Sequence, residues 1–157
     1  MLRKYFFSIA VVIACLVTSL LLANTAIAGE KEKSLLKSIE RIKAYTETGT
    51  NFDKYSELLA DAETEFNIYK RSKKNLLERD LIMKDDPISQ FMRAVRACLG
   101  SYDLAKVSWD TKNMIETSFY RREGREKANE FKQSMQESWK RAEGELDLAY
   151  KLEENIK

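Results

Sequence analysis

The stretch DPISQFMRAVRACLGSYDLAKVSW, residues 86–109, contains the signals that decide the fold. Asp86 followed by Pro87 is typical of a helix start, because the Asp side chain can accept from free N–H groups and Pro lacks the N–H that the first turn leaves unpaired. Apolar residues then recur every three or four positions, at Ile88, Phe91, Val95, Cys98, Tyr102, Ala105 and Trp109. This spacing predicts an amphipathic helix that can continue through Ile115 and Phe119.

The same spacing recurs on both sides of this stretch. A preceding segment carries Phe52, Tyr55, Leu59, Ala62, Phe66 and Tyr69, and a shorter one before it carries Leu35, Leu36, Ile39 and Ile42. After it come Ala128, Phe131, Met135, Ser138, Ala142, Ala149, Leu152 and Ile156, with Trp139 and Leu146 beside them. We therefore expect four amphipathic helices, each with one apolar stripe that needs a partner.

The first two expected helices are separated by a short turn. Gly49 suits the residue that follows a last helical turn, because glycine adopts left-handed backbone angles at little cost. Thr50 or Asn51 is expected to cap the next helix, and Asp53 is placed for a reciprocal capping arrangement with Thr50.

Two further boundaries are expected from breaks in the pattern. The apolar spacing slips after Lys70, which predicts a kink or pause at residues 71–74 before the second helix ends near Met83. Gly124 is expected to mark the turn between the third and fourth helices.

These elements predict an all-α fold, an antiparallel up-down-up-down four-helix bundle with a short first helix. Residues 29–157 form its single domain, and residues 1–28 precede it as a signal peptide. Because the first helix is short, we expect it to leave a groove over aromatic residues of its neighbours.

The first 28 residues have the order of an export signal. Arg3 and Lys4 are followed by an uncharged, largely apolar stretch over residues 5–28. The stretch ends in Ala26-Ile27-Ala28, the small-residue pattern that signal peptidases accept, so Gly29 becomes the first mature residue. We expect the protein to be exported to the periplasm or secreted.

Two other fates of this segment stay open. The uncharged stretch is long enough to span a bilayer, so an uncleaved inner-membrane anchor is the less favoured alternative. Val12-Ile13-Ala14-Cys15 resembles a bacterial lipobox, in which Cys15 is acylated, although the residues after Cys15 remain mostly apolar. Membrane contact is expected only in these two cases.

Charge argues against nucleic acid as a partner. The chain has 27 Lys and Arg residues and 25 Asp and Glu residues. Removal of residues 1–28 takes away Arg3 and Lys4 and no acid, which leaves the mature chain formally neutral. Basic runs at residues 70–74 and 121–127 have acids close by, so we interpret them as solvated helix faces rather than phosphate-binding patches.

Several classes of site are excluded by residue type. The chain has no His, which removes Ser-His and Cys-His nucleophiles and the usual zinc and haem ligand sets. Cys98 is the only Cys after residue 28, so we expect no internal disulfide and a small buried side chain there. The glycines lie too far apart for a phosphate-binding loop. We expect no cofactor, no metal and no enzymatic activity.

A candidate ligand or partner groove is expected from aromatic and acidic side chains. Asp61 and Glu65 lie one helical turn apart beside the second stripe. Two such carboxylates could act as acid and base or hold a hard cation, but the favoured interpretation is an ordinary exposed face. The aromatic side chains suit a groove, but they also suit core packing with hydroxyls at its edge. The candidate residues are Tyr55, Asp61, Glu65, Tyr102, Trp109 and Trp139.

The segments GTNFDKY, residues 49–55, LLADA, residues 58–62, and YDLAKVSW, residues 102–109, resemble a loose pattern in uncharacterised exported bacterial helical-bundle proteins. The resemblance spans most of the mature chain and rests on packing residues. It implies an envelope location and a bundle fold, and it assigns no activity.

Two functional hypotheses follow. The first is a non-enzymatic exported protein that acts through protein–protein interaction in the cell envelope, with an envelope protein or a second copy as partner. The alternative is a helical bundle that binds a small ligand in the aromatic groove.

Overall fold

A computed structural model describes residues 29–48, 51–73, 86–118 and 122–156. Within these ranges the chain is helical and contains no strand. A first helix spans residues 29–47, followed by α2 (Phe52–Ser72), α4 (Pro87–Ser118) and α5 (Arg122–Glu153). The predicted all-α helical bundle is confirmed. The predicted signal peptide, Cys15 within it, Thr50 and Met83 lie outside the described residues.

Two predicted helix starts are confirmed by their capping contacts. The Asn51 Oδ1 atom accepts from the backbone N–H groups of Asp53 at 2.8 Å and Lys54 at 3.3 Å. The Asp86 Oδ2 atom accepts from the N–H of Ser89 at 2.9 Å. Each cap satisfies N–H groups that have no partner inside the helix.

The second helix ends where the apolar spacing slips. The N–H of Lys73 donates to the carbonyl groups of Tyr69 and Lys70, both at 3.2 Å, and α2 ends at Ser72. The continuation expected toward Met83 lies in residues 74–85, outside the described ranges.

The turn expected at Gly124 is wrong. Helix α5 begins at Arg122, so Gly124 lies inside its first turn, and the connection falls between residues 118 and 122. A single glycine in a helix costs only about 1 kcal/mol relative to alanine, and the charged residues around Gly124 are good helix formers.

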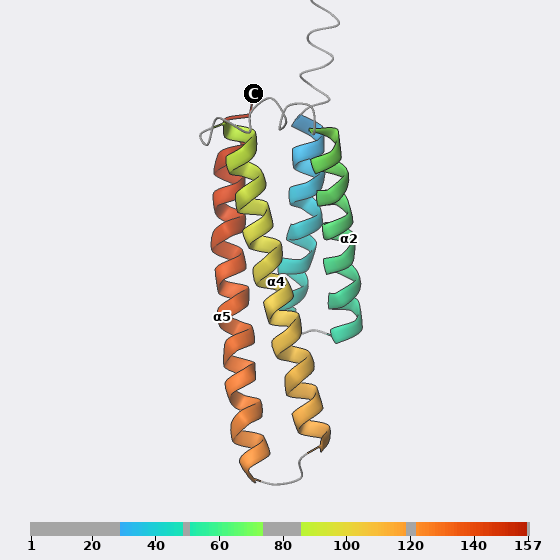
Figure 1. Ribbon diagram of the computed structural model, residues 1–157, viewed down its shortest axis with the longest axis vertical. Helices are drawn as coiled ribbons and strands as arrows, with labels where there is room; N and C mark the ends of the chain where they lie inside the picture. The colour runs from blue at the N-terminus through green and yellow to red at the C-terminus, as the bar shows by residue number, and fades with distance from the viewer. Residues whose placement is uncertain (1–28, 49–50, 74–85, 119–121, 157) are drawn as a thin grey trace, which may run out of the picture.

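Helix α4 lies beside both α2 and α5 (Figure 1). Cys98 Sγ donates to the carbonyl of Ala142 at 3.2 Å, and the Ser108 and Ser134 hydroxyls lie 3.2 Å apart. Residues early in α4 thus meet residues late in α5, so these two helices run antiparallel.

The contacts between α2 and α4 follow the same order. The Tyr69 and Phe91 rings are 5.6 Å apart, and so are those of Phe52 and Trp109. The end of α2 therefore lies beside the start of α4. The first helix joins α2 through the hydrogen bond from Tyr69 to Glu32, and its buried side chains belong to the same apolar cluster as Ala142, Leu146 and Ala149 of α5.

The four helices differ in length. Helices α4 and α5 have 32 residues each, whereas α2 has 21, and Figure 1 shows the pair continuing past the ends of α2 and the first helix. Because Phe52 at the start of α2 contacts Trp109, α4 has no α2 neighbour beyond that level. We call residues 110–118 and 122–133 the hairpin extension. The expectation of a short first helix is met, but α2 is short as well.

One apolar cluster fills the four-helix part. It combines the predicted stripes, and the tyrosines Tyr55 and Tyr102 within it are fully buried. Its largest fully buried side chains include Leu35, Leu36, Ile39, Ile42, Tyr55, Leu59, Phe91, Val95, Tyr102 and Leu146.

Candidate functional site

The four candidate aromatic residues come together where the hairpin extension leaves the four-helix part. Tyr55 is their centre: its hydroxyl donates to the carbonyl of Tyr102 at 2.8 Å and accepts from Trp139 Nε1 at 3.2 Å. Its ring centroid lies 5.7 Å from that of Trp109 and 6.1 Å from that of Trp139. We call Tyr55, Tyr102, Trp109 and Trp139 the aromatic cluster.

The aromatic cluster is packed against itself rather than arranged around a groove. Tyr55 and Tyr102 are fully buried, and the two Trp rings meet edge to face at 6.0 Å. Tilted and edge-to-face contacts at these distances are favourable for aromatic rings. Burial raises the pKa of both tyrosines above the usual range, which is itself well above physiological pH, so burial favours the neutral form further.

Asp61 and Glu65 lie elsewhere. Both are exposed and line a surface depression of about 340 Å³ between the first helix and α2, together with Lys37 and Arg41. Asp61 follows Tyr55 by six positions, which is about 240° around a helix, so the two side chains leave α2 in different directions. The six candidate residues therefore form two separate groups.

A buried charged group at the opposite end of α2 was missed by sequence reasoning. Glu32 is fully buried, and its Oε1 atom accepts from the Tyr69 hydroxyl at 2.8 Å and lies 3.0 Å from Lys73 Nζ. Lys73 Nζ also lies 5.4 Å from the centre of the Tyr69 ring. Within the described ranges Glu32 Oε2 has no hydrogen-bond partner. Burial, followed by the hydrogen bond to Glu32, raises the pKa of Tyr69.

The sequence does contain a signal for this group. Glu32 lies three and four positions before Leu35 and Leu36, on the stripe of the first helix, and Lys73 follows Tyr69 by four. Both charges therefore fall at positions whose neighbours are buried. We interpreted Lys73 as part of a solvated run, and this interpretation is wrong, because its side chain is only 11% exposed.

A stripe of exposed apolar side chains follows the outer side of α4. Leu104, Val107 and Met114 are 54%, 57% and 58% exposed. Their positions fall within about 80° around the helix axis. The stripe faces away from the core residues Tyr102 and Ala105 and continues into the hairpin extension. We call these three residues the exposed stripe.

No family model matches the chain, and neither the curated proteins nor the solved structures include a detectable relative. In the part of the chain that the structure describes, no three Cys, Asp or Glu side chains gather in a way that could hold a metal ion. No helix in the same ranges is long and apolar enough to span a membrane.

Cys98 is expected to react with thiol reagents only when the bundle opens. Its side chain is fully buried, which confirms the sequence interpretation, and burial raises its pKa to about 12. Because the thiolate is the reactive form, we expect disulfide-exchange labelling at pH 8 to be at least about a hundredfold slower than in urea. Peptide mapping separates Cys98 from Cys15, and rapid labelling of native Cys98 would contradict its placement.

Proposed function

We propose that this chain is an exported, non-enzymatic helical bundle that acts through protein–protein interaction in the cell envelope. The proposal includes cleavage between Ala28 and Gly29, a periplasmic or secreted location and a single domain over residues 29–157. Export is supported by the order of charge, apolar residues and small residues in the first 28 positions.

The proposed topology is up-down-up-down. Its support comes from antiparallel contacts between successive helices. Glu32 early in the first helix meets Tyr69 late in α2, which in turn meets Phe91 early in α4. Cys98 in α4 then contacts Ala142 in the later part of α5.

The observation that carries the interaction proposal is the exposed stripe. Single exposed apolar side chains are ordinary, but three that align on one face of a helix place apolar surface at several levels along that face. The stripe runs toward the hairpin extension, which projects beyond the first helix and α2 and is thus open to a partner from several sides (Figure 1). Helices with an apolar stripe commonly pack against a second helix or lie in a groove.

The alternative, a small ligand in the aromatic groove, has less support. The rings of Tyr55, Trp109 and Trp139 contact one another, and the Tyr55 hydroxyl is occupied on both sides. A ligand at this position would have to displace these contacts.

Site-specific photocrosslinking in the producing cell tests the interaction. With benzoylphenylalanine at Val107, we expect one crosslinked species of defined mass, either a second copy or another envelope protein. The matched control is Glu130, an exposed polar position on the hairpin extension. The proposal fails if neither Val107 nor Met114 gives an adduct that Glu130 lacks while native mass spectrometry shows a monomer. The same mass measurement reports whether the chain begins at Gly29.

A further inference from the structure

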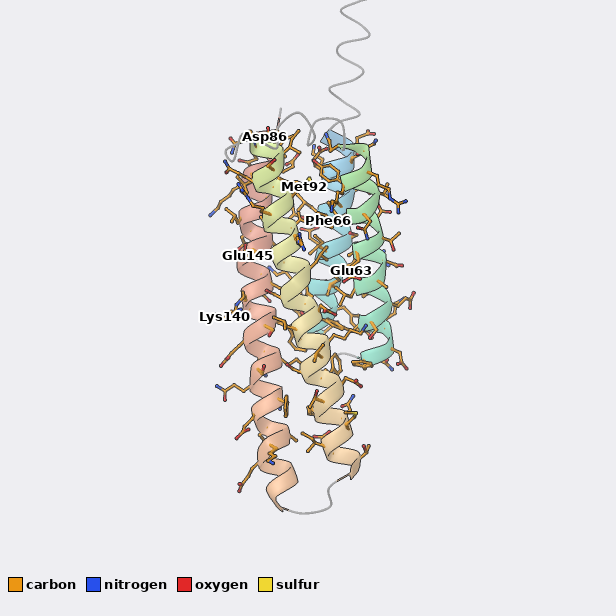
Figure 2. All side chains as sticks on the ribbon, in the orientation of Figure 1. Glu63, Phe66, Asp86, Met92, Lys140 and Glu145 are labelled. Carbon is orange, nitrogen blue, oxygen red and sulfur yellow. The ribbon has the colours of Figure 1, made fainter. Side chains whose placement is uncertain are left out.

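A second surface depression, of about 620 Å³, lies between α2 and α4. Figure 2 shows Phe66 on α2 and Met92 on α4 in the space between these two helices. The depression is distinct from both the aromatic cluster and the exposed stripe. The residues that line it are Phe66, Asn67, Lys70, Ser89, Met92, Arg93 and Arg96.

The charged residues that line this depression all carry the same sign. Lys70 comes from α2, whereas Arg93 and Arg96 come from α4, and no acidic residue is among the lining residues. The chain after residue 28 has equal numbers of acids and bases, so a site with three cations and no acid is a local departure from the average. Such a concave site attracts an anionic group.

The three cationic residues differ in whether they already interact with another residue. Lys70 and Arg96 are exposed, and neither has an ion-pair partner within the ranges that the structure describes. Arg93 already takes part in another interaction. Lys70 and Arg96 are therefore the residues on which an anion would depend. The side chains of Asn67 and Ser89 add hydrogen-bonding groups at the same depression.

The rest of the depression is apolar. Phe66 is half-buried and packs against the core, and Met92 is 8% exposed. Met side chains adapt to flexible apolar ligands, and small-molecule sites typically have volumes of about 300–1,000 Å³ with a few well-placed polar groups. A bare inorganic anion makes no use of the apolar surface.

We propose that the depression between α2 and α4 binds a small amphiphilic anion, in which one phosphate or carboxylate group is attached to a single alkyl chain. Lys70 and Arg96 contact the anionic group, and Phe66 and Met92 contact the chain. The site is independent of the proposed protein partner, because it shares no residue with the exposed stripe.

Isothermal titration of the chain recovered from the producing cells tests this site, with dodecyl phosphate below its aggregation concentration as the probe. We expect saturable binding of one equivalent. Charge reversal by Arg96→Glu or Lys70→Glu is expected to weaken binding at least about tenfold, because each removes a charge-assisted contact and adds repulsion. Two further titrations, with inorganic phosphate and with dodecanoate, show whether the site prefers a free phosphate, an alkyl phosphate or a fatty-acid carboxylate.

The matched control is Lys140→Glu. Lys140 is exposed on α5, and Figure 2 shows it on the side of α5 away from α2. This variant makes the same change in net charge and is expected to alter binding less than about twofold. Phe66→Ala is expected to weaken the binding of dodecyl phosphate but to leave any binding of inorganic phosphate unchanged.

Several outcomes would overturn the proposal. The first is the absence of saturable binding of dodecyl phosphate. The second is an equal loss of affinity in Lys140→Glu and Arg96→Glu. The third is binding of the cationic dodecyltrimethylammonium as tight as that of dodecyl phosphate. Inorganic phosphate that bound as tightly as dodecyl phosphate would remove the role of Phe66 and Met92. Circular dichroism checks that each variant is folded, and Arg96→Gln provides a milder substitution if Arg96→Glu is not.

Discussion

Lys73→Met is expected to lower the free energy of unfolding by about 3–5 kcal/mol, because it leaves a buried carboxylate without its counter-charge. Glu32 is fully buried, and its Oε1 atom has two partners, the Lys73 ammonium at 3.0 Å and the Tyr69 hydroxyl at 2.8 Å. With Met at position 73 only the neutral hydroxyl remains. Urea unfolding monitored by far-UV circular dichroism measures the difference.

Two controls separate this effect from a general loss of charge or packing. Lys70→Met removes an exposed Lys from the last turn of the same helix and is expected to change the free energy of unfolding by less than about 1 kcal/mol. Glu32→Gln combined with Lys73→Met removes both charges, so we expect the double variant to recover much of the loss. A Lys73→Met variant that is as stable as Lys70→Met would show that the carboxylate is satisfied by other means.

The buried pair matters for the architecture because of where it lies. Glu32 is in the first turns of the first helix and Lys73 directly follows the last residue of α2, so the pair joins the two helix ends that are far from their connecting turn. The cost of burying two charges means that the pair need not add net stability over an apolar pair. It does penalise any register of the two helices in which Glu32 and Lys73 do not meet.

Local signals were sufficient for most of the helical structure. Asp86 and Asn51 cap their helices as predicted, because a cap depends on a few neighbouring residues and their hydrogen bonds. The apolar spacing likewise identified the buried faces, and Phe91, Val95 and Tyr102 are all fully buried. Each of these predictions needs only the sequence of one helix, because a cap and an apolar stripe are both defined by the spacing of residues along it.

The candidate site depended on contacts between helices, and the sequence predicted it less well. Tyr55, Tyr102, Trp109 and Trp139 meet as expected, but whether aromatic rings enclose a groove or fill it is decided by helix distance, which no spacing encodes. The pairing of Lys73 with Glu32 and the meeting of Lys70 with Arg96 also join residues far apart in the chain. We interpreted the basic run at residues 70–74 from its sequence neighbours alone. In the structure, Lys73 of this run belongs to the buried pair and Lys70 lines the surface depression.

Tyr55→Ala is expected to lower the free energy of unfolding by about 3–5 kcal/mol, the usual cost of removing a large buried aromatic side chain. Tyr55 is the common contact of Tyr102, Trp109 and Trp139, and its hydroxyl takes part in two hydrogen bonds. The emission spectrum of the two Trp residues is expected to shift to longer wavelength, because water can enter beside their rings. Urea unfolding and fluorescence measure both effects on one sample.

Tyr55→Phe divides this loss between the ring and the hydroxyl. Phe keeps the ring contacts but leaves Trp139 Nε1 without its acceptor, so we expect a loss of about 1–2 kcal/mol. Tyr45→Phe is the matched control, because the Tyr45 hydroxyl accepts only an exposed bond from the Asn51 N–H at 3.2 Å. Equal effects of Tyr55→Phe and Tyr45→Phe would show that the buried hydrogen bonds contribute little.

The same variants test how the hairpin extension is held. Trp109 and Trp139 connect α4 and α5 to α2, and among the described residues neither the first helix nor α2 continues beyond their level (Figure 1). If the aromatic cluster fixes this junction, Tyr55→Ala increases amide hydrogen exchange in residues 110–118 more than in residues 91–102, which keep the core packing of all four helices. A uniform increase along α4 would mean that Tyr55 stabilises the bundle as a whole and that the extension is held by the contacts between α4 and α5 alone.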